Sequence, residues 1–271
     1  MTEVPHVAVS GAFDDLRSRE LRFLEEASRL GSLTVLLWPD DLVERVTGCM
    51  PKFPLAERRY LLEAVRTVGE VLVADSMLAP SELPETLQAD VWADYPPTAA
   101  AERGAWCAAR NMAYRVFDAG ELAGFPVPVQ TAASNRKKVV VTGCYDWLHS
   151  GHVRFFEEVS QYGDPIVILG NDENIRFLKG EGHPLLTQDE RRYVVGSFKF
   201  VSQTLIASGK GWVDADPEIQ WLKPDIYAVN EDGDKGGKRD YCLANGIEYL
   251  VLSRTPAPGL PRRSSTDLRG F

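Results

Sequence analysis

The sequence predicts two tandem α/β domains, each built on a parallel β-sheet. Two observations support this: β-branched hydrophobic stretches alternate with amphipathic ones, and the second half of the chain repeats the first. Strands that alternate with helices imply a parallel sheet covered on both faces. A chain of 271 residues can form one large domain or two modest ones, and the repeat favours two.

The repeat is clearest at the start of each half. Val7-Ala-Val-Ser-Gly-Ala-Phe-Asp-Asp-Leu-Arg-Ser-Arg-Glu20 aligns with Val139-Val-Val-Thr-Gly-Cys-Tyr-Asp-Trp-Leu-His-Ser-Gly-His152. Further along, Glu57-Arg-Arg-Tyr60 recurs as Glu190-Arg-Arg-Tyr193. We therefore place one domain at residues 1–133 and a second at residues 134–271, joined by a polar linker around residues 130–137.

In each half we expect the order strand, helix, strand, helix, strand, helix, strand. The strands expected in the second half are residues 138–142, 165–170, 225–229 and 249–252, and its helices are residues 153–162, 187–198 and 238–245. Sites in parallel sheets lie at the carboxyl ends of the strands. Four residues fall at those ends, so we expect their loops to converge: Gly143, Asn171, Asn230 and Arg254.

Composition excludes several classes of protein. A net charge of −9 argues against a nucleic-acid binder, which usually carries a basic face. No apolar run is long enough to span a bilayer, and no secretory signal precedes the first strand, so we expect a cytoplasmic protein without a membrane partner. The four cysteines form no C-x-x-C pair, which disfavours zinc and redox roles.

Two histidines, His149 and His152, lie three residues apart where a strand ends and a helix begins. A helix start offers free N–H groups and a positive dipole end, which suit phosphate, and two imidazoles add side-chain donors. Half of a metal site, which would need further ligands such as His183, is the alternative that we disfavour. The pattern indicates nucleotidyl transfer.

The stretch from Gly143 to His152 resembles the H-x-G-H signature of the cytidylyltransferase-like nucleotidyltransferases, a Rossmann-like family. It is most similar to the glycerol-3-phosphate, choline-phosphate and ethanolamine-phosphate cytidylyltransferases. Three further segments, spanning residues 138 to 269 with the first, resemble family motifs in the family's order: Phe177-Leu-Lys179 before Glu190-Arg191, Asn230-Glu-Asp-Gly-Asp234, and Arg254-Thr-Pro256 with Arg263-Ser-Ser-Thr266.

The resemblance implies a role for each matching residue. His149, His152 and Lys179 are the expected catalytic residues, and Lys179 is expected in a flexible loop with Gly180 and Gly182. Gly143 would let the backbone approach phosphate. The expected nucleotide-binding residues are Thr142, Gly143, Tyr145, Asp146, Gly151, Arg191, Asn230, Asp232, Arg254, Arg263, Ser265 and Thr266.

Some assignments keep alternatives. Asp146 can orient a histidine, cap the following helix, or hold Mg²⁺, the expected cofactor, through a water. An insertion at residues 257–262 interrupts the closing motif, so Arg254, Arg262 and Arg263 all remain candidates for its arginine. Ser265 and Thr266 resemble a helix N-cap that faces phosphate.

The first half has lost its signature. Arg17 and Glu20 occupy the two histidine positions, and the Glu20 carboxylate would repel a triphosphate. We expect residues 1–133 to be catalytically inactive and to act as a built-in dimer partner, an intramolecular pseudo-dimer, with further homodimerisation left open. In that case, deleting residues 1–133 gives insoluble or inactive protein.

The leading hypothesis is a cytidylyltransferase that joins CMP from CTP to a phosphorylated alcohol or a phosphonate and releases pyrophosphate. The first alternative is an adenylyltransferase that uses ATP and a sugar phosphate, because Lys179-Gly-Glu-Gly-His-Pro184 also resembles the K-G-x-x-R-P segment of heptose-phosphate adenylyltransferases. The second is a non-catalytic nucleotide-binding scaffold.

Overall fold

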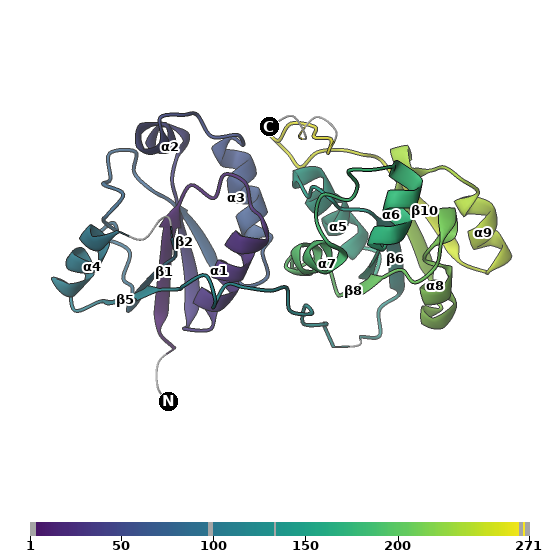
Figure 1. Ribbon diagram of the computed structural model, residues 1–271, viewed down its shortest axis with the longest axis horizontal. Helices are drawn as coiled ribbons and strands as arrows, with labels where there is room; N and C mark the ends of the chain where they lie inside the picture. The colour runs from purple at the N-terminus through teal and green to yellow at the C-terminus, as the bar shows by residue number, and fades with distance from the viewer. Residues whose placement is uncertain (1–3, 97–99, 133, 266–267, 269–271) are drawn as a thin grey trace. The chain divides into compact units, whose positions relative to one another are not determined.

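The computed structural model describes residues 4–96, 100–132, 134–265 and 268 (Figure 1). The chain divides into two compact units, Met1–Gly124 and Phe125–Phe271. The division falls before the boundary predicted at residue 133, because residues 125–132 pack on the second unit. The Phe125 ring lies 6.4 Å from the Tyr193 ring, and the Thr131 N–H donates to the Ser202 carbonyl at 2.9 Å.

The first unit holds a five-stranded parallel sheet in the order β3-β2-β1-β4-β5. Its elements are β1 (His6–Gly11), α1 (Ser18–Ser28), β2 (Ser32–Leu37), α2 (Asp40–Thr47), α3 (Leu55–Glu63), β3 (Glu70–Val73), β4 (Val91–Asp94), α4 (Ala101–Ala108) and β5 (Ala113–Val116).

The second unit repeats this topology in the order β8-β7-β6-β9-β10. Its elements are β6 (Lys138–Gly143), α5 (Ser150–Ser160), β7 (Asp164–Leu169), α6 (Asp172–Lys179), α7 (Gln188–Gly196), β8 (Gln203–Ile206), the 3-10 turn η1 (Gly211–Val213), α8 (Asp216–Leu222), β9 (Ile226–Asn230), the 3-10 turn η2 (Glu231–Gly233), α9 (Lys238–Ala244) and β10 (Glu248–Leu252).

The predicted tandem α/β fold is confirmed, with one strand more in each unit than the four expected. The additional strands, β3 and β8, are four-residue edge strands, too short to give a clear hydrophobic period. The segment before Gly180 is also helical: Lys179 is the last residue of α6 rather than part of a loop, and the backbone turns at Gly180 with φ +87°.

Side chains alternate across the central strand of the second sheet and build a core on each face. Val139 and Val141 pack with α5 and α7, whereas Val140 faces α8 and α9. The same anchor starts the central strand of both units: the Asp90 carboxylate accepts from the His6 N–H at 2.8 Å, and Asp225 accepts from Lys138 at the same distance. The repeat therefore extends to individual hydrogen bonds.

Candidate functional site

A pocket of about 250 Å³ opens at the carboxyl ends of β6 and β9 in the second unit. It brings together most of the residues predicted for the site. Arg191 and Arg263 are not among its lining residues, and Thr266 lies outside the described residues. The predicted residues that line it are Thr142, Gly143, Tyr145, Asp146, His149, Gly151, His152, Lys179, Asn230, Asp232, Arg254 and Ser265.

His149 is the N-cap of α5, and its Nδ1 accepts from the Gly151 N–H at 3.1 Å. An Nδ1 that accepts carries no proton, so this bond assigns the neutral ring the Nε2–H tautomer. The side chain is 1% exposed, and its Nε2 has no hydrogen-bond partner among the described residues. Within the part of the chain that the structure describes, the site therefore holds a buried donor without an acceptor.

His152 lies on the first turn of α5 and stacks on His149, with the ring centroids 4.0 Å apart at 27°. The Tyr145 ring lies edge-on to His152 at 5.3 Å. Within the described chain, the buried Nδ1 of His152 also has no hydrogen-bond partner. Two adjacent rings thus offer polar nitrogen atoms that the protein itself leaves unsatisfied, which is typical of a ligand site.

Both imidazoles are neutral at pH 7. Burial, with the nearby Arg254 and Arg263 charges, lowers the pKa of His149 to about 4. Burial, followed by the influence of His149, Arg254 and Lys179, lowers the pKa of His152 well below its usual value. The pair therefore offers neutral nitrogen atoms to the pocket, and the positive charge of the site comes from other side chains.

The lowered His149 pKa predicts acid sensitivity. Between pH 6.5 and about 4 the unfolded chain binds a proton at His149 that the folded protein does not, so the free energy of unfolding falls as the pH drops through this window. At its full extent the loss is about 3 kcal/mol. Urea unfolding at stepped pH values should show this slope, and His149→Asn should flatten it; an equal slope in the variant contradicts the assignment.

Two glycines let the rings come close. A Cβ at Gly151 would lie 3.0 Å from Cε1 of His149, and one at Gly143 would lie 2.7 Å from Cε2 of Tyr145. Tyr145 itself has φ +52°. Gly143 was predicted to admit phosphate to the backbone; in the structure a side chain there would first displace the tyrosine ring that backs His152.

Gly143→Ala is expected to destabilise the protein by about 1–3 kcal/mol, as overpacking does. It should also lower activity, on the order of tenfold or more, because Tyr145 must move against His152. Gly11→Ala is the matched control, since its Cβ would meet Phe13 at an ordinary 3.5 Å. Urea unfolding and pyrophosphate release measure both variants. Equal effects of the two substitutions would refute the steric explanation.

Asp146 anchors a loop. Its Oδ1 accepts from the backbone N–H groups of Leu185 at 2.7 Å and Leu186 at 3.0 Å. Asp14 accepts in the same way from Lys52 and Phe53 in the first unit. The carboxylate fixes the segment that leads into α7, and its Oδ2 lies 3.9 Å from Nδ1 of His183, a histidine outside the stacked pair; the three roles considered for Asp146 stay predictions.

Arg191 is fully buried, and its guanidinium donates hydrogen bonds to groups of the protein itself. Its guanidinium donates to the carbonyls of Leu186, Cys144 and Gly170 at 2.7 to 3.2 Å and pairs with Asp172. The Cys144 and Gly170 carbonyls follow β6 and β7, and Leu186 precedes α7, so Arg191 joins the loops that frame the site. A nucleotide role was predicted for this residue, but the structure directs its side chain to the backbone.

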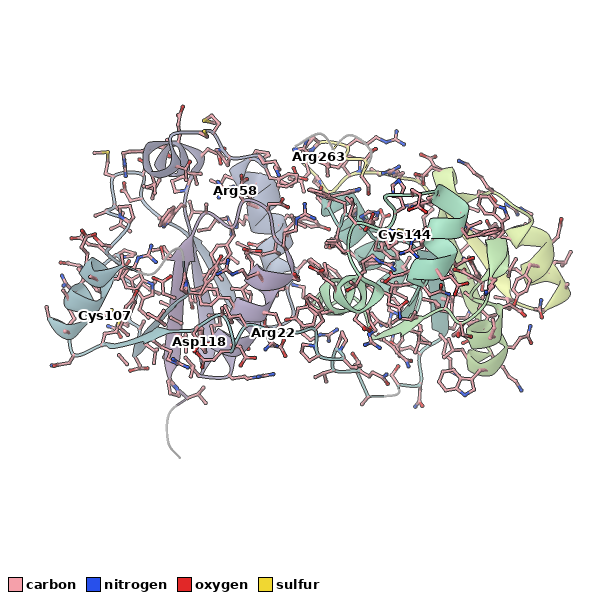
Figure 2. The ribbon with its side chains drawn as sticks, in the orientation of Figure 1. Arg22, Arg58, Cys107, Asp118, Cys144 and Arg263 are labelled. Carbon is pink, nitrogen blue, oxygen red and sulfur yellow. The ribbon has the colours of Figure 1, made fainter. Side chains whose placement is uncertain are left out.

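Arg58 of α3 makes the same set of contacts in the first unit, where Figure 2 labels it. It donates to the carbonyls of Phe53, Ala12 and Trp38 and pairs with Asp40. The unit that lacks both histidines therefore keeps this arginine. Its presence in both units indicates a requirement of the fold.

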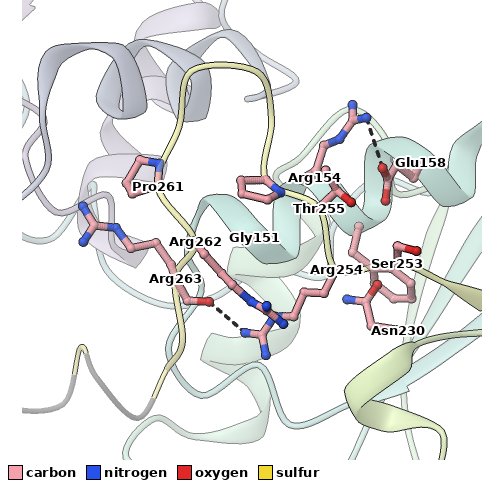
Figure 3. A pocket seen from close by; sticks show the side chains of 12 residues that line it. Gly151, Arg154, Glu158, Asn230, Ser253, Arg254, Thr255, Pro261, Arg262 and Arg263 are labelled. Atoms are coloured by element: carbon pink, nitrogen blue, oxygen red, sulfur yellow. Dashed lines mark hydrogen bonds and ion pairs between the residues drawn. The ribbon is translucent and has the colours of Figure 1, made fainter.

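Of the three candidate arginines, Arg254 lines the pocket with the histidines. It donates to the Arg263 carbonyl at 2.8 Å, as Figure 3 shows, and forms an ion pair with Asp232. Arg262 is exposed and lies 3.5 Å from a carboxylate oxygen of Glu231. Ser265, expected as a helix cap, donates to the Trp147 carbonyl at 3.1 Å.

Sequence reasoning missed Lys238, which lines the pocket at the start of α9. Its ammonium donates to the Gly233 carbonyl at 3.0 Å, and burial lowers its pKa despite the nearby Asp234. Asn230 Oδ1 is buried without a hydrogen-bond partner in the described part of the chain. The available signal for Lys238 was its alignment with a basic residue, Arg103, in the first half.

The pocket suits an anion. Lys179, Lys238 and Arg254 outnumber its two carboxylates, one of which Arg254 neutralises, and the neutral imidazoles add donors. As for a metal, the described residues contain no group of three or more His, Cys, Asp or Glu side chains arranged to hold one. They do not fit a resident metal centre, and Asp146 already uses one oxygen in backbone bonds.

At the equivalent position in the first unit, the start of α1, a side chain of the protein accepts a hydrogen bond from the backbone. The Glu20 carboxylate accepts from the backbone N–H of Arg17, the N-cap of α1, at 3.1 Å. It also accepts from the Tyr95 hydroxyl at 3.2 Å. The carboxylate thus takes the place at the helix start that a bound anion would take.

Comparison with known proteins places these observations in a family context. The cytidylyltransferase-like family matches residues 140–251. Bifunctional protein HldE of Aliarcobacter butzleri (strain RM4018) is 36% identical over 104 residues, which is 38% of this chain and 21% of HldE. FAD synthase of Ferroglobus placidus (strain DSM 10642 / AEDII12DO) is 36% identical over 119 residues, which is 43% of this chain and 74% of the synthase. The match therefore spans about a fifth of HldE and most of the synthase.

Among solved structures, the lipopolysaccharide core biosynthesis protein from Thermoplasma volcanium GSS1 aligns with 45% of this chain and 98% of its own at 20% identity, with a TM-score of 0.38. Along the described chain, none of the helices combines the length and apolarity that a bilayer crossing needs.

Proposed function

Because the chain belongs to the cytidylyltransferase-like nucleotidyltransferases, we propose that its second unit transfers CMP from CTP to a phosphorylated alcohol or a phosphonate and releases pyrophosphate. The proposal covers the nucleotidyl transfer itself, the base and the acceptor. The observation that carries it is the stacked, neutral pair of His149 and His152, with unsatisfied nitrogens in a pocket rimmed by three cationic side chains.

In this reaction an oxygen of the acceptor's phosphate or phosphonate attacks the α-phosphorus of the triphosphate. The bond from that phosphorus to the bridging β-phosphate oxygen breaks, and pyrophosphate leaves with the electron pair. The attacking group is already an anion, so no covalent intermediate on the enzyme is needed. The work of the protein is positioning and neutralising charge.

The residues divide this work. His149 and His152 would donate to the α-phosphate and the leaving pyrophosphate, where charge grows in the transition state. Lys179 and Arg254 would offset the negative charge of the triphosphate, and Lys238, which also lines the pocket, would hold the acceptor's anionic group. Arg263 would act through its carbonyl, which fixes Arg254.

Mg²⁺ would arrive with the nucleotide. It binds largely through substrate phosphates and waters, with one or two carboxylates at most. This fits a site whose described residues form no cage for a metal. We therefore treat magnesium as part of the substrate, MgCTP, and assign none of the reaction steps above to it.

The alternative donor is ATP, with a sugar phosphate as the expected acceptor. The FAD synthase relative favours adenylyl transfer, since FAD is an adenine dinucleotide. Pyrophosphate release by the full chain separates the hypotheses when CTP, ATP, GTP and UTP are each tested with glycerol 3-phosphate, phosphoethanolamine, a sugar phosphate and riboflavin 5′-phosphate. Release with CTP and a phosphorylated alcohol supports the proposal. Pyrophosphate release with ATP alone would replace the cytidylyltransferase proposal by adenylyl transfer. Nucleotide binding without pyrophosphate release with any acceptor would indicate a non-catalytic scaffold.

We further infer that residues 1–133 take no part in the transfer step. The support is the exchange of both histidines for Arg17 and Glu20, whose carboxylate already occupies the helix start. The role of this region as an internal dimer partner, and any further homodimer, remain predictions. They are tested by sedimentation of the full chain and of a fragment that lacks residues 1–133.

A further inference from the structure

The first unit contains a pocket of its own, about 400 Å³ in volume, larger than the pocket of about 250 Å³ in the second unit. It opens at the same place in the fold, beyond the carboxyl ends of β1, β2 and β4. Its walls come from the ends of these strands, the first turns of α1 and α4, and the end of α2. A volume of this size is in the range that small-molecule sites occupy.

Trp38 gives this pocket an aromatic side chain that the second site lacks, whereas Phe13 corresponds to Tyr145, which is aromatic as well. Trp38 stands where the second unit has Gly170: each follows the second strand and donates its N–H to the last residue of the central strand, at 3.0 and 3.1 Å respectively. Tyr95 follows β4, and Phe13 follows β1 with φ +44°. These three rings line the pocket, and the Trp38 indole N–H is fixed by the Ser10 hydroxyl at 2.8 Å.

The charge of the lining is reversed. Four carboxylates line this pocket against one guanidinium, whereas two carboxylates face three cationic side chains in the second unit. The one guanidinium, Arg103, is 3% exposed and neutralised by the buried Asp94 at 2.6 Å. It also donates to the Pro80 carbonyl at 3.0 Å. The four carboxylates belong to Asp14, Asp15, Glu20 and Glu102.

Most of these carboxylates have internal partners, so their charge is fixed in place. Asp15 pairs with Arg17 and Lys52, and Glu20 accepts at the helix start. Glu102 is exposed at the rim and forms no ion pair or hydrogen bond with any described residue. Among the described lining residues the cation is Arg103, which Asp94 neutralises, so a phosphate would meet mainly acceptors, whereas an ammonium group would meet the Glu102 carboxylate. The Arg19 and Arg103 guanidinium groups already lie over the Tyr95 and Trp38 rings, at 5.2 and 5.9 Å from the ring centroids, so these rings offer apolar surface to the body of a ligand.

We propose that the first unit binds a small organic cation, with its ammonium group near Glu102 and its apolar body against the rings of Trp38, Phe13 and Tyr95. This site is independent of nucleotidyl transfer in the second unit. It gives the unit without the histidines a binding role in place of the catalytic one.

Three probes of similar shape and different charge test the proposal on the full chain: phenethylammonium, 2-phenylethanol and 3-phenylpropionate. Saturation-transfer NMR and calorimetric titration measure their binding. We expect phenethylammonium to bind at least tenfold more tightly than 3-phenylpropionate, with the alcohol between them. Equal binding of the anion, or no binding of the cation, overturns the proposal.

Variants locate the site. Ser81 lines the pocket in a turn, so Ser81→Trp should fill the cavity and abolish phenethylammonium binding, whereas Ser81→Ala should leave it unchanged. Glu102→Lys should weaken binding of the cation at least tenfold. Binding that survives Ser81→Trp places the cation elsewhere and also overturns the proposal. The test measures binding and not turnover, so its outcome does not depend on whether CTP is the substrate. Pyrophosphate release by the Ser81→Trp variant shows that its second unit is intact.

Discussion

Replacing His149 with alanine is expected to lower kcat by about 10²- to 10³-fold, or about 3–4 kcal/mol in the activation barrier, the usual cost of removing one preorganised donor from a developing anion. The Nε2–H of this ring is buried and has no partner in the described chain, so its hydrogen bond is available to the substrate. The change also removes the acceptor for the Gly151 N–H, an N-cap loss of about 1 kcal/mol. Pyrophosphate release under saturating substrate measures the first effect and urea unfolding the second.

Arg17→Ala is the matched control, because Arg17 holds the same position in the first unit. We expect it to leave kcat within a factor of two of the unsubstituted protein. A His149 variant that retains full kcat, or an Arg17 variant that loses as much, would show that the histidine pair does not act on the reacting phosphates.

Replacing Arg191 with methionine is expected to destabilise the second unit by about 3 kcal/mol, because three backbone carbonyls lose their charged donor in the interior. The loops after β6 and β7 would also lose their common support. Catalytic activity should then fall even at temperatures where the unit stays folded. Activity assays at low temperature and urea unfolding followed together separate these two effects.

Arg58→Met is the corresponding change in the first unit, with the same three kinds of carbonyl acceptor. It should cost similar stability and leave the kcat of the folded protein nearly unchanged. If Arg191→Met lowered activity through lost nucleotide contacts alone, stability would be preserved and KM for CTP would rise. That outcome would restore the nucleotide role predicted for Arg191.

The tandem fold could be predicted because the chain carries an internal comparison. The alignment of residues 7–20 with residues 139–152 located both central strands and both first helices. The short edge strands β3 and β8 were not predicted, because four residues are too few to show a clear hydrophobic periodicity. Helix α6 escaped because its charged and apolar residues precede two glycines that indicate a loop.

Which residues face the pocket was harder to predict than where the pocket lies in the fold. The signature correctly led to a pocket at the strand ends, but it could not separate side chains that face a ligand from those that hold loops. Arg191 and Asp146 follow the family pattern and yet bond to backbone groups. Their equivalents Arg58 and Asp14 lie in a half without the histidines, and that was the signal in the sequence for a structural role. Lys238 follows the Asn230–Asp234 motif and was not predicted for the site; tertiary structure brings it to the pocket.

The Glu20 carboxylate determines how ligand binding changes the stability of the two first helices, α1 and α5. Because it permanently caps α1, the first unit gains nothing at that helix from a triphosphate, whereas the uncompensated donors beside α5 gain a partner only on ligation. Occupancy should accordingly slow amide exchange around α5 and leave α1 as it was. The hydrogen bonds at the start of α1 would then be complete without ligand, whereas those at the start of α5 would be completed by the substrate. Deuterium uptake would distinguish the two helices.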